Sequence, residues 1–351
     1  MLVIDGHLDL AFNALSLNRD LARSISEIRK TEAGMTGKGR AMNTVAFPEM
    51  REGEVGICLA TVLARLITDG VSESYSNPAI SYAVGQGQLA YYRVLEKQGL
   101  VLVIEDLEAL EAHIEVWRES PDENAPLGFV ISMEGADAIT DPANLKTWWE
   151  DGLRVLSIVH YGVNAYAHGT GTRGGLTFLG RELLEEMDSL GMVLDVTHLS
   201  DESFWEALDA FSGSVIASHN NCRALVPGDR QFSDEQIRAL VEREAVIGVA
   251  FDAWMLYPGW VKGKTPNTVV GMEAAVDHVD HLHELAGDSR NVGIGSDLDG
   301  GFGKDQCPHD LDTIADLQKI PDMLKRRGYA DEDVENVVWR NWLRLFRKAW
   351  S

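Results

Sequence analysis

Short apolar runs recur along the chain, and a histidine or an acidic residue directly follows most of them. The runs at 128–133, 155–159, 192–197, 214–218, 246–251 and 292–296 are followed by Glu134, His160, His198, His219, Asp252 and Asp297. Runs of this length that are apolar throughout are typical of parallel strands buried on both faces. Two more runs, at 2–4 and 53–63, bring the number of predicted strands to eight.

Segments with the apolar spacing of amphipathic helices lie between the predicted strands. Helices are predicted at 80–99, 180–190 and 234–243, and Ser233 is a suitable N-cap for the last of them. The C-terminal stretch 339–346 has the same spacing and also predicts a helix.

Three other segments carry predictions of a different kind. Residues 100–105 are predicted to be a further strand or extended stretch, followed by a helix through Leu110 and Ile114. The segment 11–52 is polar and contains glycines, and within it Arg29-Lys30 and residues 34–39 are predicted to form a loop over the barrel mouth. Residues 254–268 are predicted to form a long loop after the seventh strand, able to act as a lid or a pocket wall.

Eight strands alternating with helices predict an α/β protein with a (β/α)8 TIM-type barrel. A doubly wound open sheet is the alternative, but no Gly-x-Gly-x-x-Gly turn follows the first strand. The chain of 351 residues has no internal repeat, low-complexity tract or linker, so we expect residues 1–351 to form one barrel domain.

The balance of charge restricts the classes of partner. The net charge is −24, with 55 acidic and 31 basic residues, which argues against nucleic acid or an anionic membrane surface as a partner. Cys58, Cys222 and Cys307 are odd in number and far apart, which fits a reducing compartment without disulfides. No signal peptide, lipid-anchor signal or long apolar span is visible, so we expect a cytoplasmic protein.

The residues after the predicted strands carry the chemistry. His7 and Asp9 are two apart at the end of the first strand, so their side chains point to the same side. A barrel gathers all such residues at one mouth, where several buried imidazoles and carboxylates would be costly unless they bind something. A divalent metal is the simplest ligand for this set.

The number of candidate ligands favours two ions. Five residues are too many for one open catalytic site and suit two metals sharing Glu134; they are His7, Asp9, Glu134, His198 and His219. Imidazole and carboxylate ligands without thiolate suit Zn²⁺, with Mn²⁺ or Co²⁺ as alternatives. Such a pair can activate a bridging water, with Asp297 as the acid/base and His160 directed at the scissile carbonyl or its oxyanion.

The chain also resembles the membrane (renal) dipeptidase family of zinc metallopeptidases in the amidohydrolase superfamily. The matching stretches run in the family's order over nearly the whole chain: DGHLDL at 5–10, MEG at 133–135, LSIVH at 156–160, GLT at 175–177 with Gly180, LGMVLDVTH at 190–198, ASHN at 217–220, GDRQFSDE at 228–235 and GIGSDLDG at 293–300. Together they are highly specific, although each is weak alone.

The resemblance implies a role for each candidate residue. His7 and Asp9 would hold one zinc ion, Glu134 would bridge, and His198 and His219 would complete the second site. His160 would contact the substrate, and Asp297 would be the acid/base residue.

Arg230 would pair with the C-terminal carboxylate of a dipeptide, which suits the bidentate fork of a guanidinium. The implied reaction is hydrolysis of a dipeptide, with D- as well as L-residues accepted at its C-terminal position. A homodimer is common in the family and is one expectation for the assembly.

The sequence departs from the family pattern at the pocket walls. Leu8 stands where the family often has Asn, and GLTFLG at 175–180 replaces Gly-Leu-Thr-Pro-Phe-Gly. The loop from Trp254 is particular to this chain, and the N-terminal loop is long and has no clear match. These differences bear on side-chain specificity.

Three other readings remain open from the sequence. One is a related reaction on the same metals, such as hydrolysis of an N-acyl amino acid or a lactone. Another is a catalytically silent metal-binding scaffold. His278, His281 and His283 raise the third, a separate metal site, although we expect their helix to lie outside the barrel.

Overall fold

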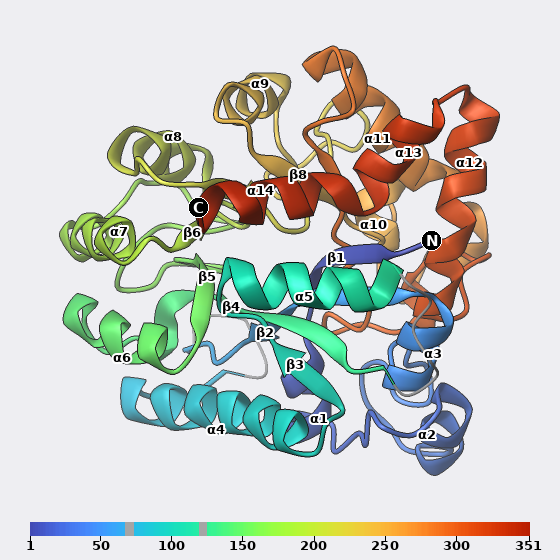
Figure 1. Ribbon diagram of the computed structural model, residues 1–351, viewed down its shortest axis with the longest axis horizontal. Helices are drawn as coiled ribbons and strands as arrows, with labels where there is room; N and C mark the ends of the chain where they lie inside the picture. The colour runs from blue at the N-terminus through green and yellow to red at the C-terminus, as the bar shows by residue number, and fades with distance from the viewer. Residues whose placement is uncertain (67–73, 119–124) are drawn as a thin grey trace.

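The computed structural model describes residues 1–66, 74–118 and 125–351, and its centre is a closed barrel of parallel strands (Figure 1). The barrel strands are β1 (Val3–Leu8), β2 (Val55–Val62), β4 (Leu127–Glu134), β5 (Leu153–Ser157), β6 (Val193–Asp195), β7 (Val215–Ala217), β8 (Val246–Val249) and β9 (Val292–Ile294). Their order is β2-β1-β9-β8-β7-β6-β5-β4, and the pairing of β2 with β4 closes the ring. The predicted (β/α)8 barrel is confirmed.

A ninth strand, β3 (Val101–Val103), lies outside this ring. It pairs with residues 127–129 at the start of β4, while β5 pairs with the same strand from Ile131 onward. The two strands therefore share one edge of β4, so the extended stretch predicted at 100–105 widens the sheet without entering the closed barrel.

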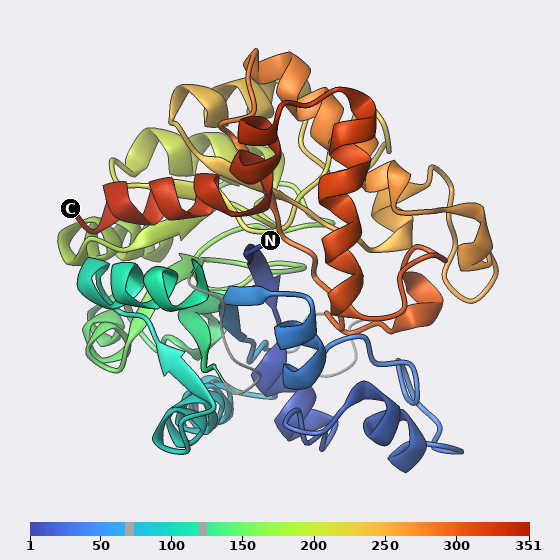
Figure 2. The ribbon, with the colours of Figure 1, turned by 45° about the vertical axis from the view of Figure 1, so that its right-hand side comes forward.

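Helices surround the barrel as an outer ring (Figures 1 and 2). The longer ones are α4 (Pro78–Lys97), α5 (Leu107–Arg118), α7 (Phe178–Leu190), α8 (Asp201–Ala210), α9 (Asp234–Glu242), α11 (Glu273–Ala286), α12 (Ile320–Arg327) and α14 (Asn341–Ala349). Shorter helices are α6 (Leu145–Glu150), α10 (Ala253–Leu256) and α13 (Asp331–Glu335). Ser233 caps α9 in a capping box with Gln236, as the sequence predicts.

The prediction of a loop over the barrel mouth is wrong at Arg29 and Lys30, which lie in a helix, whereas residues 34–39 belong to no helix or strand, as predicted. The segment 11–52 contains most of α1 (Leu10–Ser16), together with α2 (Ile25–Thr31) and α3 (Phe47–Glu52). These helices have only six or seven residues, too few to display a clear apolar period. Ser24 and Glu27 form a capping box at the start of α2, which is a local signal for a helix.

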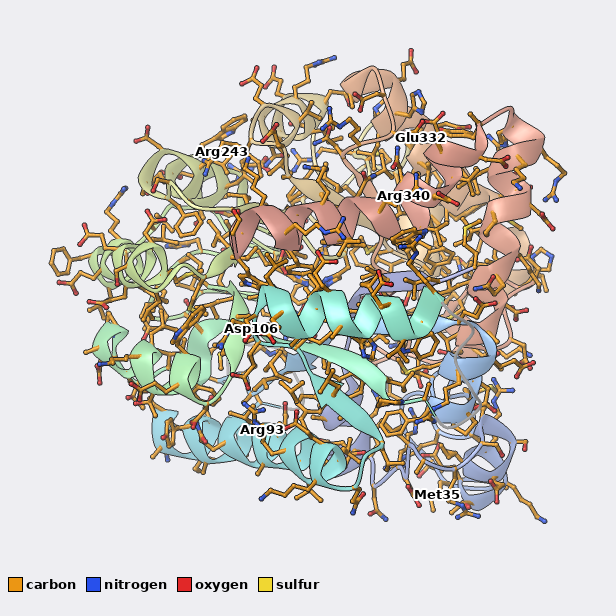
Figure 3. The ribbon with its side chains drawn as sticks, in the orientation of Figure 1. Met35, Arg93, Asp106, Arg243, Glu332 and Arg340 are labelled. Atoms are coloured by element: carbon orange, nitrogen blue, oxygen red, sulfur yellow. The ribbon has the colours of Figure 1, made fainter. Side chains whose placement is uncertain are left out.

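Side chains from the outer helices and from the residues next to them form hydrogen bonds and ion pairs with one another and with the barrel. Figures 1 and 2 show α14 beside α5, and Arg347 of α14 pairs with Glu111 of α5 at 2.7 Å. The buried indole of Trp342 donates to the carbonyl of Ile294 at 3.0 Å. Arg243, labelled in Figure 3, donates to carbonyls at the end of α8 and just beyond it.

Within the described ranges, no helix combines the length and apolar character that crossing a bilayer requires.

Glycines allow three strands to approach one another near the barrel mouth. A Cβ on Gly295 would lie 1.8 Å from the carbonyl oxygen of Ser218, and one on Gly248 would lie 2.1 Å from the same atom. Both clashes involve backbone, which cannot rotate away as a side chain can. The residue after Ser218 is His219, so this close approach also fixes the position of a candidate ligand.

We expect Gly295→Ala to lower the free energy of unfolding by about 1–3 kcal/mol, because the added methyl group overpacks the barrel. Urea denaturation would measure the change. Gly87→Ala is the matched control, since no atom lies within 4 Å of a Cβ at that site in α4. The control should stabilise the protein by about 0.5–1 kcal/mol through its better helix propensity. Equal stability of Gly295→Ala and the wild type would contradict the close approach.

Candidate active site

The predicted site residues lie together at the C-terminal end of the barrel. His7 and Glu134 lie near the ends of their strands, whereas His160, His198 and Asp297 follow theirs by three residues. The candidate residues line a cavity of about 590 Å³, except His7, which is buried against them.

Buried aspartates hold the backbone where it leaves the sheet. The Asp5 carboxylate accepts hydrogen bonds from the amides of His7 (3.1 Å) and Ser296 (2.8 Å). Asp195 accepts in the same way from Thr197 and Ser218, both at 3.0 Å. These bonds satisfy buried amides at the ends of the strands and just beyond them, so they fix the backbone that carries the site residues.

Glu134 is the centre of the cluster. Its Oε1 lies 3.0 Å from His198 Nε2, 3.3 Å from His219 Nε2 and 3.9 Å from His7 Nε2. Its Oε2 lies 3.7 Å from His160 Nε2. One carboxylate therefore faces four imidazoles, each through the same ring nitrogen.

The Nδ1 atoms of three of these histidines face hydroxyl groups. His198 Nδ1 lies 3.1 Å from Thr170 Oγ1, and His219 Nδ1 lies 2.8 Å from Ser218 Oγ. His7 Nδ1 lies 3.5 Å from Thr61 Oγ1. A hydroxyl oxygen can accept a hydrogen bond from Nδ1–H, and a proton held on Nδ1 leaves the Nε2 lone pair free to face the centre of the cluster.

Burial sets the charge states of the cluster. It lowers the pKa of His7 to about 3 and that of His219 to about 4, and it lowers the pKa of His198 well below its usual range. Burial alone would raise the pKa of Glu134, but the nearby histidines outweigh it and hold that pKa well below normal. The result is neutral imidazoles around an ionised carboxylate, which is the state that binds a metal.

The donor set fits divalent metal ions. Among the described residues, His7 Nε2 and Asp9 Oδ1 are buried polar atoms without a hydrogen-bond partner, and they lie 3.8 Å apart. Three overlapping groups have ligand atoms within 4.8 Å of one another: His7, Glu134 and His219; Glu134, His160 and His198; and His7, Asp9 and Asp297. Bound cations would satisfy the two unpartnered atoms and offset the cost of burying carboxylates.

Asp297 lies on the side of the cluster formed by β1 and β9. Its Oδ1 is 3.9 Å from His7 Nε2. Burial raises the pKa of Asp297 well above normal, and the neighbouring carboxylates of Glu134 and Asp9 raise it further. Asp297 and His198 have φ values of 57° and 69°, a left-handed backbone that is uncommon for residues other than glycine.

Arg230 brings a buried positive charge to the cavity. Its side chain donates to the carbonyl oxygen of His219 at 2.8 Å and to Asn220 Oδ1. These bonds hold the guanidinium beside the histidine cluster. Arg230 is only 3% exposed and lines the cavity, so its side chain is largely shielded from bulk water.

The cavity also contains polar residues to which the sequence assigned no role. Asp252 follows β8, and its carboxylate accepts from Gln306 Nε2 at 2.8 Å. Burial raises the pKa of Asp252 to about 7. Its position after an apolar run was a visible signal, whereas nothing in the sequence near Arg65 marked that residue as part of the cavity lining.

The segment 254–268 forms part of the cavity wall, as the sequence predicts. It begins within the short helix α10, and Trp254, Met255, Trp260 and Lys262 line the cavity. Lys38, from the loop predicted at 34–39, lines the same cavity.

The histidines of α11 do not join the candidate metal cluster. His278 Nδ1 accepts from the amide of Cys222 at 3.1 Å, and His281 Nε2 lies 2.9 Å from Asp234 Oδ1. His283 packs edge-on against Tyr329. In the described parts of the chain, none of these three histidines belongs to a group that could hold a metal. Their partners are structural, and α11 lies in the outer helix ring (Figure 2).

A (β/α)8 barrel with buried imidazoles and carboxylates at its mouth is the architecture of metal-dependent hydrolases. The family whose sequence profile matches residues 1–350 is described as membrane dipeptidase, peptidase family M19. The chain belongs to this family. The metallo-dipeptidase class expected from the sequence is therefore confirmed at the level of the family.

Individual relatives match about two thirds of the chain. An uncharacterized protein of Klebsiella pneumoniae is 30% identical over 239 residues, which cover 65% of this chain and 84% of that protein. The dipeptidase tcpJ of Claviceps purpurea is 28% identical over 63% of this chain and 52% of its own length, so the match covers about half of that dipeptidase.

A solved structure shares the fold over the whole chain. It is a metallopeptidase from Rhodobacter sphaeroides bound to a phosphinate mimic of the dipeptide L-Ala-D-Ala, with a TM-score of 0.81 and 22% identity. The match covers 100% of this chain and 99% of that one.

Proposed function

We propose that this protein is a zinc-dependent dipeptidase that hydrolyses L-Xaa-L-Xaa and L-Xaa-D-Xaa dipeptides. The observation that carries the proposal is the combination of unpartnered ligand atoms, on His7 and Asp9, with a buried arginine in the same cavity. The Rhodobacter relative binds a mimic of an L,D-dipeptide, which supports the stereochemical part of the proposal.

Five residues would hold two zinc ions with Glu134 shared between them: His7, Asp9, Glu134, His198 and His219. Mn²⁺ or Co²⁺ would be suitable substitutes. When bound, a pair of such ions lowers the pKa of water toward about 7 and stabilises negative charge on an attacked carbonyl.

The remaining residues would handle protons and orient the substrate. Asp297 would accept a proton as water attacks and deliver it to the leaving amine, since burial and neighbouring carboxylates favour its protonated form. His160 would donate a hydrogen bond to the scissile carbonyl as negative charge develops on its oxygen. The cavity of about 590 Å³ would exclude most water around a dipeptide.

Arg230 would bind the C-terminal carboxylate of the dipeptide. We expect Arg230→Ala to raise KM strongly, with a smaller effect on kcat. The fall in kcat/KM should correspond to a loss of about 2–5 kcal/mol in transition-state binding. Steady-state kinetics on a dipeptide and on the corresponding dipeptide amide would test this. The amide lacks the carboxylate, so its hydrolysis should be slow in the wild type and little changed by the substitution.

Arg230→Lys is the matched control, because it retains the charge but loses the planar fork. We expect it to recover only part of the affinity. An unchanged KM in Arg230→Ala would place the carboxylate elsewhere and favour a substrate without one, such as a lactone.

The function as a whole is tested by metal analysis paired with a dipeptide panel. About two zinc ions per chain with cleavage of L,L- or L,D-dipeptides is the expected result. Two bound metals with cleavage only of N-acyl amino acids or lactones would show that the substrate is not a dipeptide. Metal without turnover on any of these substrates would indicate a binding scaffold, and no metal after supplementation would refute the proposed ligands.

We further propose that residues 1–351 act as one catalytic domain with a small peptide as substrate, and that two copies form a homodimer. Light scattering of the purified chain would measure the assembly. A monomeric mass would refute the dimer without affecting the proposed reaction.

A further inference from the structure

His160 differs from the other histidines around Glu134 in the partner of its Nδ1 atom. His7, His198 and His219 each present Nδ1 to a hydroxyl oxygen. His160 Nδ1 instead lies 2.9 Å from Nη1 of Arg65. All four rings present Nε2 to Glu134, so the difference concerns only the outer nitrogen.

A hydroxyl group leaves the tautomer of a histidine open, because its oxygen can both accept and donate. For His198 the neighbouring contacts select one tautomer. Thr170 Oγ1 donates a hydrogen bond to the His198 carbonyl oxygen at 3.2 Å. The hydroxyl oxygen is then left to accept from Nδ1–H of His198. Nε2 of His198 keeps its lone pair, as a metal ligand requires.

A guanidinium imposes the opposite tautomer. Arginine has five N–H donors and no acceptor, and it stays charged in proteins. The contact between Arg65 and His160 is therefore a hydrogen bond only if Nη1 donates and Nδ1 accepts. Nδ1 then carries no proton, and the proton of the neutral ring lies on Nε2.

We propose that Arg65 is a positioning residue that fixes His160 as a neutral Nε2–H donor and keeps it from binding metal. Both ring nitrogens are then committed, one to Arg65 and the other to its own proton. His160 and His198 therefore differ in the ring nitrogen that carries the proton, even though both approach the carboxylate of Glu134.

The position of Nε2 agrees with a donor reserved for a ligand. It lies 3.7 Å from Glu134 Oε2, too far for a good hydrogen bond, and His160 and Arg65 both line the cavity. The donor would face the substrate carbonyl, and in this respect the inference rests on the proposed function. The tautomer itself depends only on the contact with Arg65.

Nuclear magnetic resonance of the full chain labelled with ¹⁵N-histidine tests the tautomer directly. Two-bond ¹H–¹⁵N correlations distinguish protonated from unprotonated ring nitrogens, and the spectrum of His160→Gln assigns the His160 signals. We expect a proton on Nε2 and none on Nδ1. Adding zinc should alter the ring nitrogens of His198 but leave those of His160 without the shift of a metal ligand.

Variants of Arg65 test the cause. In Arg65→Met, His160 should shift toward the Nδ1–H form or a mixture, and kcat should fall on the order of 10- to 100-fold with little change in KM. Arg65→Lys retains a charged donor and should restore the Nε2–H form and much of the rate. Arg238→Met, on the exposed face of α9, is the matched control and should change neither property.

Several outcomes would overturn the inference. They are a proton on Nδ1 in the wild type, a zinc-dependent ligand shift at His160, or an Arg65→Met spectrum identical to that of the wild type. If Arg65→Met fails to fold, the wild-type spectra with and without zinc still decide the tautomer. The spectra need no substrate, so a protein inactive on dipeptides can still pass this test, and an active dipeptidase can fail it.

Discussion

Asp297→Asn is expected to lower kcat by about 10²- to 10⁴-fold, the range over which a general acid/base contributes to a reaction. The substitution preserves the shape of the side chain but removes its ability to accept and return a proton. Asp297 is suited to this exchange because burial, together with Glu134 and Asp9, raises its pKa well above that of a free carboxyl. Steady-state kinetics on a dipeptide that the wild type cleaves would measure the loss.

Two further measurements separate catalysis from structure in this variant. Zinc content and the unfolding midpoint should remain close to those of the wild type, because the proposed ligand set does not include Asp297. Asp209→Asn, on the exposed face of α8, is the matched control and should retain full activity. An Asp297→Asn enzyme with wild-type kcat would refute the acid/base role, whereas a loss of zinc would make Asp297 a ligand.

The Glu134→Gln variant is expected to lack most of the zinc that the wild type is proposed to bind, and its kcat/KM should be lower by at least about 10³-fold. Glu134 Oε1 lies within 3.9 Å of three of the proposed ligand histidines, so it is the carboxylate best placed to be shared. A glutamine has nearly the same shape but no charge to balance two cations. Metal ions contribute several kcal/mol to such reactions, and each 1.4 kcal/mol is about a factor of ten in rate.

Chelation provides an independent test of the same site. Zinc at about 100 times its dissociation constant would stabilise the wild type by about 2.7 kcal/mol, so a chelator should lower its unfolding midpoint. The same treatment should have little effect on Glu134→Gln, which has little zinc to lose. Glu242→Gln, exposed on α9, is the control and should respond as the wild type does. A chelator-sensitive Glu134→Gln protein with normal zinc content would contradict the shared ligand.

Several features could be predicted from the sequence because they depend on chain order and local pattern. Apolar runs identified the eight barrel strands, and a parallel barrel necessarily brings the ends of all its strands to one mouth. For this reason the candidate residues from His7 to Asp297 could be grouped before their positions were known. The cap at Ser233 was equally local.

Strand ends and short helices were harder to predict. The apolar runs at 192–197 and 246–251 continue past β6 and β8, which end at Asp195 and Val249. The residues beyond the strands stay buried because side chains such as Asp195 satisfy their backbone amides. A buried segment outside the sheet has the same apolar pattern as a buried strand, so the sequence cannot show where the strand ends. The helices α2 and α3 were missed because they are too short to display a period.

The sequence by itself determined the barrel, the family and the histidines and carboxylates proposed as ligands, since these follow from periodicity, strand order and motif spacing. Only the tertiary structure decided which partner each histidine meets. Arg65 is 95 positions from His160, and Thr170 is 28 positions from His198. A tautomer depends on whether the neighbouring atom donates or accepts through space, and no spacing along the chain contains that information.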